Sequence, residues 1–154
     1  MMAPEVYFLR YAFPCSHILL NIKKEISEED YKKMEVAALE GIKLDRKFLE
    51  RVFFRAFQRM QKIGDELGKD KWDIDIIKEY FCKRHNAIVN SSDNPDSFKD
   101  MCKVHEGKVI EIADNFLTVK YKNKKERKVK IDYVRGVKVG EKVRIHYNYA
   151  IEKV

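Results

Sequence analysis

The chain has 154 residues, of which 45% are hydrophobic and 37% charged, and it carries a formal net charge of +7. This composition is typical of a soluble globular protein with enough apolar side chains for a core, in one domain or two small ones. No apolar run approaches the ~20 residues that a membrane helix needs, so a membrane-spanning helix is excluded and no membrane partner is expected.

Targeting and redox signals indicate a cytoplasmic protein. The start of the chain has no basic stretch and no A-x-A cleavage site, so no signal peptide is expected. The three cysteines are odd in number and widely spaced, which argues against a disulfide framework and for a reducing cytosol. The abundance of Lys, Glu and Ile, with Gln58 and Gln61 as the only glutamines, is typical of proteins from thermophiles.

The positive charge is concentrated in the last third of the chain. Residues 101–154 hold 14 Lys and Arg against 7 Asp and Glu, whereas residues 1–100 are neutral. A basic module favours nucleic acid or another acidic partner. A solvated, lysine-rich outer surface explains the same charge without any partner, and both interpretations stay open at this point.

The first part of the chain predicts helices with recognisable start signals. Ser27, Asp45 and Asp73 are expected N-caps, and Gly41 can supply a left-handed C-terminal turn. Apolar residues at helical spacing follow each cap. The expected helices, in chain order, span residues 4–13, 15–22, 28–40, 46–67 and 74–88.

A polar loop over 90–96 is the expected linker, followed by one short turn over 98–102. From Gly107 onward apolar and polar residues alternate, which is the pattern of half-buried strands. We therefore predict an α+β protein of two domains, an all-α helical bundle over 1–98 and a small closed barrel over 99–154. The five expected strands span residues 109–112, 117–121, 129–133, 143–147 and 150–154.

Two side chains in the C-terminal part can carry chemistry. Cys102 precedes the first expected strand, and nearby positive charge would lower the pKa of its thiol and favour a ligand or nucleophile role. His146 falls on the polar, outward phase of the fourth strand, which does not favour a core histidine. The alternative for Cys102 is a small buried hydrophobic residue at a domain junction, because free cysteine is among the most buried residue types.

Two motifs in this part resemble a known family. Met101-Cys102-x-x-x-x-Gly107-Lys108-Val109 is similar to the opening M-C-x-x-x-P-G-K-V of the HypC/HupF family of hydrogenase maturation chaperones. Residues 137–151 resemble the ending of that family, V-x-V-G-D-x-V-L-V-H-x-G-F-A-I. The resemblance covers residues 101–154, with the spacing kept through both motifs, and no part of residues 1–98 resembles the family.

The resemblance implies a small OB-like barrel and a non-enzymatic role. Members of the family help to assemble the iron, cyanide and carbonyl cofactor of nickel–iron hydrogenases, and they contact a partner maturation protein and the large-subunit precursor. Their functional cysteine matches Cys102 and their histidine matches His146. Iron, held transiently, is therefore the expected cofactor, and no other is expected. On this hypothesis Cys102 is accessible and faces a common surface with His146, while the helical domain supplies docking specificity.

Three residues depart from the family pattern. The family cysteine becomes N-terminal once methionine is removed, whereas Cys102 is internal and has no free amine. Glu106 replaces the proline before the glycine, and Asn148 replaces the glycine after the histidine.

A second constellation of metal ligands lies in the helical part. Cys15-x-His17 and Cys82-x-x-His85 together supply four side chains that could hold zinc tetrahedrally. Structural zinc pairs are more typical of tight turns than of apolar helices. The alternative is that both cysteines fill the core and both histidines form hydrogen bonds near helix ends.

A nucleic-acid-binding module is the main alternative function, and a protein-interaction domain is another. Tyrosines near the basic hairpin could stack on bases. Strict alternation, however, turns Tyr121 and Tyr147 inward, away from the basic side chains. No phosphate-cradling glycine loop or other catalytic motif is present. The candidate anion contacts of the hairpin are Lys120, Lys122, Lys124, Lys125, Arg127, Lys128 and Lys130.

Overall fold

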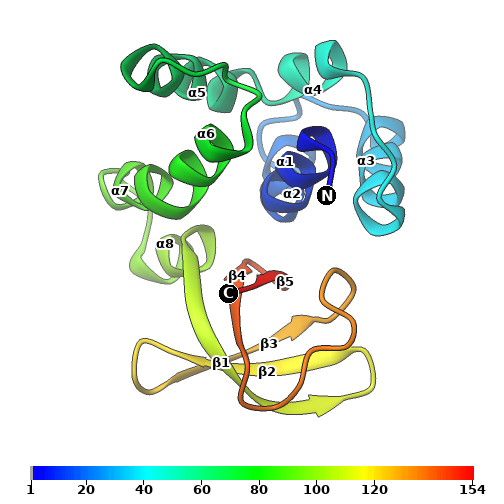
Figure 1. The fold of residues 1–154 in the computed structure, drawn as a ribbon, viewed down its shortest axis with the longest axis vertical. Coiled ribbons are helices and arrows are strands. Elements are labelled where there is room, and N and C mark those ends of the chain that lie inside the picture. The colour runs from blue at the N-terminus through cyan, green and yellow to red at the C-terminus, as the bar shows by residue number, and fades with distance from the viewer. Residues whose placement is uncertain (1) are drawn as a thin grey trace. The chain divides into compact units, whose positions relative to one another are not determined.

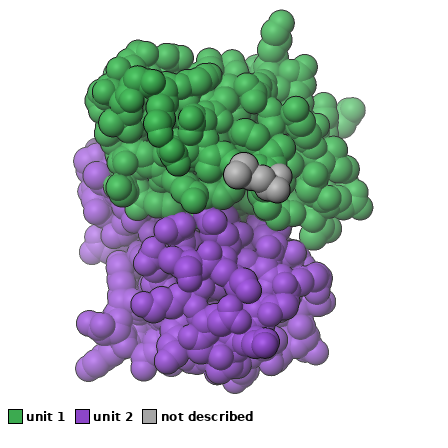
Figure 2. Space-filling model, in the orientation of Figure 1, with its two compact units in different colours: residues 1–85 green, residues 86–154 purple. Residues whose placement is uncertain are grey.

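The computed structural model describes residues 2–154, which form two compact units, one ending at His85 and the other spanning Asn86–Val154. Figure 2 colours the two units differently. The expected α+β fold is confirmed: helices make up the first unit, and a closed five-stranded barrel dominates the second (Figure 1). None of the helices in the described residues is long and apolar enough to cross a membrane.

The first unit is helical throughout, and its core surrounds α1. Seven of the nine residues of α1 are buried, as expected for a helix that is apolar on nearly all sides. Phe8 has ring contacts with Phe53, Phe57, Trp72 and Phe81, with centroids between 4.6 and 5.8 Å apart. The elements of this unit are α1 (Pro4–Ala12), the 3₁₀ turn η1 (Phe13–Cys15), α2 (Ser16–Asn21), α3 (Glu28–Glu40), α4 (Arg46–Val52), α5 (Phe54–Leu67), α6 (Ile74–Glu79) and the π-helical turn η2 (Tyr80–Arg84).

The predicted helix caps are confirmed. The side chains of Ser27, Asp45 and Asp73 each accept a hydrogen bond from a backbone N–H in the first turn that follows. Gly41 ends α3 in the left-handed region with φ 73°.

Two long helices of the sequence prediction are interrupted in the structure. The predicted helix over 46–67 breaks at Phe53, with φ −105° and ψ 43°, where the Phe53 ring packs against Phe8. The predicted helix over 74–88 widens into η2, which lets the adjacent Tyr80 and Phe81 both be buried. Tertiary packing of aromatic rings overrides helical periodicity at both places.

The second unit consists of the barrel and the helices before it. The expected count of five strands is confirmed, and their order around the barrel is β1-β2-β3-β5-β4. The first and third strands begin earlier than predicted, and Tyr133 lies outside the third. The elements are α7 (His85–Asn90, shared with the first unit at its first residue), α8 (Asp96–Cys102), β1 (Val104–Ala113), β2 (Phe116–Tyr121), β3 (Lys125–Lys130), β4 (Lys142–His146) and β5 (Tyr149–Lys153).

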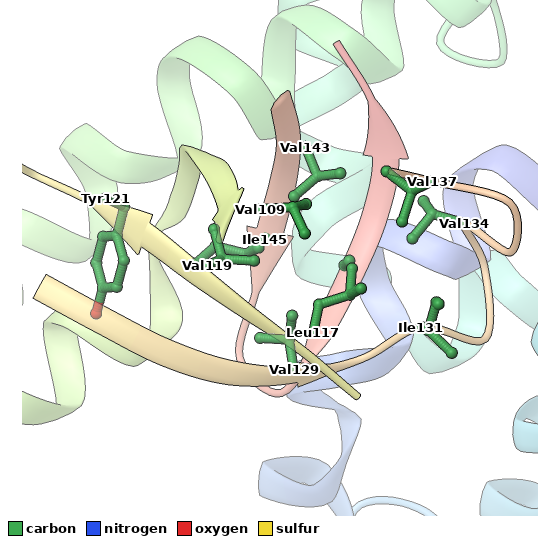
Figure 3. Packing of buried hydrophobic residues seen from close by; sticks show 11 residues of the cluster. Val109, Leu117, Val119, Tyr121, Val129, Ile131, Val134, Val137, Val143 and Ile145 are labelled. Atoms are coloured by element: carbon green, nitrogen blue, oxygen red, sulfur yellow. The ribbon is translucent and has the colours of Figure 1, made fainter. Parts of the chain in front are cut away.

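The barrel encloses an apolar core contributed by all five strands and the loop after β3. Figure 3 shows these side chains, among them Val109, Leu117 and Ile145, pointing into the space between the strands. Gly107 faces the same interior. A Cβ atom there would lie 2.5 Å from Val119 Cγ1 and 2.8 Å from the carbonyl oxygen of Lys120, so only glycine lets β1 and β2 approach this closely.

One side chain of α7 completes the start of β1. The Asn86 side chain donates from Nδ2 to the carbonyl oxygen of Val104 and accepts at Oδ1 from the Val104 N–H, both at 2.8 Å. This amide satisfies the two backbone groups of Val104 as a neighbouring strand would.

Candidate functional site

The backbone brings Cys102 and His146 to the same end of the barrel. Cys102 is the last residue of α8, and the extended Lys103 that follows leads directly into β1. Val104 stands opposite His146 in the β1–β4 ladder. The N–H of Tyr147 donates to the carbonyl oxygen of Met101 at 3.1 Å. The two residues thus lie on adjoining stretches of backbone.

Both side chains are buried, so the expectation of an accessible Cys102 is wrong, and its burial agrees with the alternative of a small buried residue. Cys102 is 6% exposed and His146 is 1% exposed. The phase of His146 is as predicted, because its ladder partner Val104 also points away from the barrel core. The alternation of buried and exposed residues along β4 stops at His146, however, because this outward residue is buried like the inward Ile145 before it. Period-two patterning separates the two faces of a strand but does not tell what covers the outer face.

The turn between β4 and β5 holds a strained residue beside His146. Tyr147 has φ 56°, a left-handed conformation that is uncommon for a bulky side chain. Its carbonyl oxygen accepts from Arg127 Nη1 at 3.0 Å, and its N–H is bonded to Met101. Because Tyr147 lies in this turn and is only partly buried, the prediction that it points into the core is wrong. Strain of this kind is found at functional sites when the surroundings enforce it.

An ionic cluster, which we call the Asp100 anchor, fixes α8 to the barrel. It comprises Asp100, His105, Tyr121, Lys122 and Arg127. The carboxylate of Asp100 accepts from the Tyr121 hydroxyl at 2.6 Å, from Lys122 Nζ at 3.0 Å and from Arg127 Nη2 at 3.1 Å. The ring of His105 completes the cluster, with Nε2 at 2.8 Å from the backbone carbonyl oxygen of Asp100. The anchor therefore holds the last turn of α8, and Cys102 with it.

The anchor keeps Asp100 ionised. Burial alone would raise the pKa of its carboxyl group, but hydrogen bonds from Tyr121 and Lys122 and nearby positive charge hold that pKa far below its usual range. Sequence reasoning missed this residue. It lies in a short helix, and its partners Tyr121 and Arg127 are 21 and 27 positions away, so no local pattern marks it.

Arg127 does not lie on the outer surface of the hairpin, where the sequence prediction placed it among the anion contacts. It is 9% exposed and points into the end of the barrel. The reason is register: β3 starts at Lys125, so Arg127 shares the inward phase with Val129. Tyr121 is buried as predicted and stacks beneath Arg127, with 4.8 Å between guanidinium and ring. Neither residue is free to contact a nucleobase.

The remaining metal candidates belong to the first unit. His17 Nδ1 is 3.0 Å from the carbonyl oxygen of Pro14, and Cys82 Sγ donates to the Tyr11 hydroxyl at 3.7 Å. Cys15 ends η1, and the ring of His85 packs near Phe81. Within residues 2–154, no group of three or more His, Cys, Asp or Glu side chains is arranged to hold a metal ion. A zinc site in this unit stays a prediction.

The buried imidazole of His105 should make the free energy of unfolding depend on pH. Burial lowers the pKa of its imidazole below the ordinary value of about 6.5 and outweighs the attraction of Asp100. The unfolded chain therefore takes up a proton that the folded chain refuses, so we expect the free energy of unfolding to fall as the pH drops below about 6.5. Urea unfolding at a series of pH values measures it. His105→Gln should show a shallower decline than the wild-type protein, and identical slopes would contradict this assignment.

These features define a small closed barrel whose first strand follows a cysteine and whose fourth strand ends in a histidine. The model of the HupF/HypC family matches residues 101–154. The resemblance of the two sequence motifs to that family is thus confirmed for the C-terminal region. A search of the curated proteins found no match to the chain.

Proposed function

We propose that the C-terminal barrel acts as a HypC-like accessory protein in the maturation of a nickel–iron hydrogenase, with Cys102 and His146 holding an iron fragment in transit or contacting a partner protein. The observation that carries this proposal is the family match over the residues that contain both side chains. The adjoining backbone positions of Cys102 and His146 support it.

The chemistry of the two side chains suits this cargo. Thiolate and imidazole are both good ligands for iron, and two protein ligands leave coordination positions for the small ligands of the fragment. Burial, and after it the positive charge of Lys122, lower the pKa of the neighbouring Lys103.

Burial of both side chains adds a requirement to the proposal. With Cys102 6% and His146 1% exposed, an iron fragment reaches them only after the atoms that cover them move. Cys102 is also held at the end of a helix, whereas the cysteine of the family lies at a free N-terminus. We infer that loading is coupled to movement of the β4–β5 turn that follows His146, and that the Asp100 anchor keeps Cys102 in place meanwhile.

The proposal includes no catalytic step. The barrel would pass its cargo between protein partners in the maturation of the hydrogenase, in the cytoplasm, and the helical unit would supply docking specificity. Burial of Arg127 removes one of the candidate anion contacts on which the nucleic-acid alternative depended, and the buried Tyr121 cannot stack on a base.

Metal analysis after anaerobic purification tests the proposal. We expect iron bound to the wild-type protein to be lost in Cys102→Ala and reduced in His146→Ala, because each variant removes one ligand. Cys15→Ala is the matched control and should keep its iron, since this cysteine lies in the other unit. Circular dichroism verifies that each variant is folded.

Equal iron in the wild-type protein and Cys102→Ala, or full hydrogenase maturation by Cys102→Ala, would contradict the proposal. Zinc retained by both proteins would instead support a site at Cys15, His17, Cys82 and His85.

A further inference from the structure

Three lysines from three neighbouring strands stand side by side on the outer face of the barrel. Lys108 of β1 is opposite Lys120 of β2 in one ladder and opposite Lys142 of β4 in the other. We call these three residues the lysine row. Like charges directly opposite each other in a sheet are destabilising, so this register works against the fold unless an anion offsets it.

Among the described residues, the lysine row forms no ion pair. Within residues 2–154, none of the three ammonium groups lies within 4.0 Å of a carboxylate, although Glu126 faces Lys120 across the β2–β3 ladder. The other carboxylates nearby are engaged elsewhere. Glu106 pairs with Arg144 at 3.3 Å, and Glu141 pairs with Lys153 at 3.4 Å.

The lysine row lines a hollow of about 370 Å³, to which Lys122 and Asn123 of the β2–β3 turn and Glu106 of β1 also contribute. This volume lies within the usual range for small-molecule sites, roughly 300–1,000 Å³. Lys122 is paired with Asp100 and Glu106 with Arg144, so the charge in the hollow that has no ion pair among the described residues is that of the lysine row. The hollow contains neither Cys102 nor His146 and is a separate site from the one that the proposed function uses.

We propose that the lysine row binds a polyphosphate group, such as the di- or triphosphate of a small molecule. The three ammonium groups stand on strands about 4.8 Å apart, so each can bind an oxygen of a different phosphoryl group. A single phosphate is too small to contact all three groups equally well. The only aromatic side chain in the hollow, Tyr121, is committed to Asp100 through its hydroxyl. The site therefore recognises charge and offers no platform for base stacking, which disfavours single-stranded nucleic acid.

Calorimetric titration of the full chain with tripolyphosphate at low ionic strength tests this site. We expect saturable 1:1 binding that weakens as salt is added. Lys108→Gln and Lys142→Gln should each weaken binding by about tenfold. Lys128→Gln is the matched control: this lysine lies on the outer face of β3 over Phe116, outside the hollow, and its loss should change the affinity less than about twofold.

Four outcomes would overturn the proposal. They are no saturable binding by the folded wild-type protein, an equal loss in Lys128→Gln, equally tight binding of inorganic phosphate, and displacement of tripolyphosphate by a short single-stranded oligonucleotide that binds more tightly. Circular dichroism separates loss of binding from loss of fold. Iron binding through Cys102 is a different readout, so either proposal can fail without the other.

Discussion

Gly107→Ala is expected to lower the free energy of unfolding of the barrel by about 3 kcal/mol, at the upper end of the cost of overpacking a core. The added methyl group would lie 2.5 Å from Val119 Cγ1 and 2.8 Å from the carbonyl oxygen of Lys120. A side chain can give way, but the carbonyl oxygen belongs to β2 and moves only with that strand. Urea unfolding measures the loss.

Gly136→Ala is the matched control for this substitution. Gly136 has φ 92° and nothing within 4 Å of its virtual Cβ, so alanine there meets conformational strain but no clash. We expect a loss of about 1 kcal/mol, which is typical of alanine in a backbone that suits glycine. Equal losses in the two variants would show that close approach of β1 and β2 is not what selects glycine at 107.

Asp100→Ala is expected to cost about 3 kcal/mol, because removing one partner of a buried ion pair leaves the other charge uncompensated. Arg127 would keep its cation inside the end of the barrel, and the Tyr121 hydroxyl would lose its acceptor at 2.6 Å. Urea unfolding at neutral pH measures this loss. Asp93→Ala, an exposed carboxylate in the preceding loop, should stay within about 0.5 kcal/mol of the wild-type protein.

Acid should abolish most of the difference between Asp100→Ala and the wild-type protein. The pKa of Asp100 is depressed in the folded state, so its contribution is complete above the unfolded value of about 3.9 and is lost as the pH falls toward the folded value. The two unfolding curves should therefore converge below about pH 4. A difference that stays constant as the pH falls well below about 4 would show that the anchor acts by packing and not by charge.

Local sequence signals predicted the parts of the fold that depend on near neighbours. Ser27, Asp45 and Asp73 cap their helices through backbone groups within three residues, so the caps could be predicted without tertiary information. The same holds for the barrel core, because Leu117, Val119 and their counterparts alternate along each strand.

The parts that sequence reasoning missed depend on distant residues. The break at Phe53 follows from packing against Phe8 in α1, which helical periodicity cannot represent. The Asp100 anchor likewise joins chain segments that are far apart in sequence. For the lysine row, alternation placed Lys120 and Lys142 outward, but only the strand register shows that Lys108 stands between them.

The amide of Asn86 has a consequence for where this module can be cut. Unpaired backbone N–H and C=O groups at the start of a strand can pair with the strands of other chains. At Val104 the side chain of Asn86 forms hydrogen bonds with both of these groups instead. A fragment beginning at Met101 would contain every residue that the family model matches and yet lose both Asn86 and Asp100. A fragment in which the start of β1 keeps its hydrogen-bond partner must therefore include Asn86 and be longer than the segment that the family model matches. A fragment that begins at Met101 would be prone to self-association.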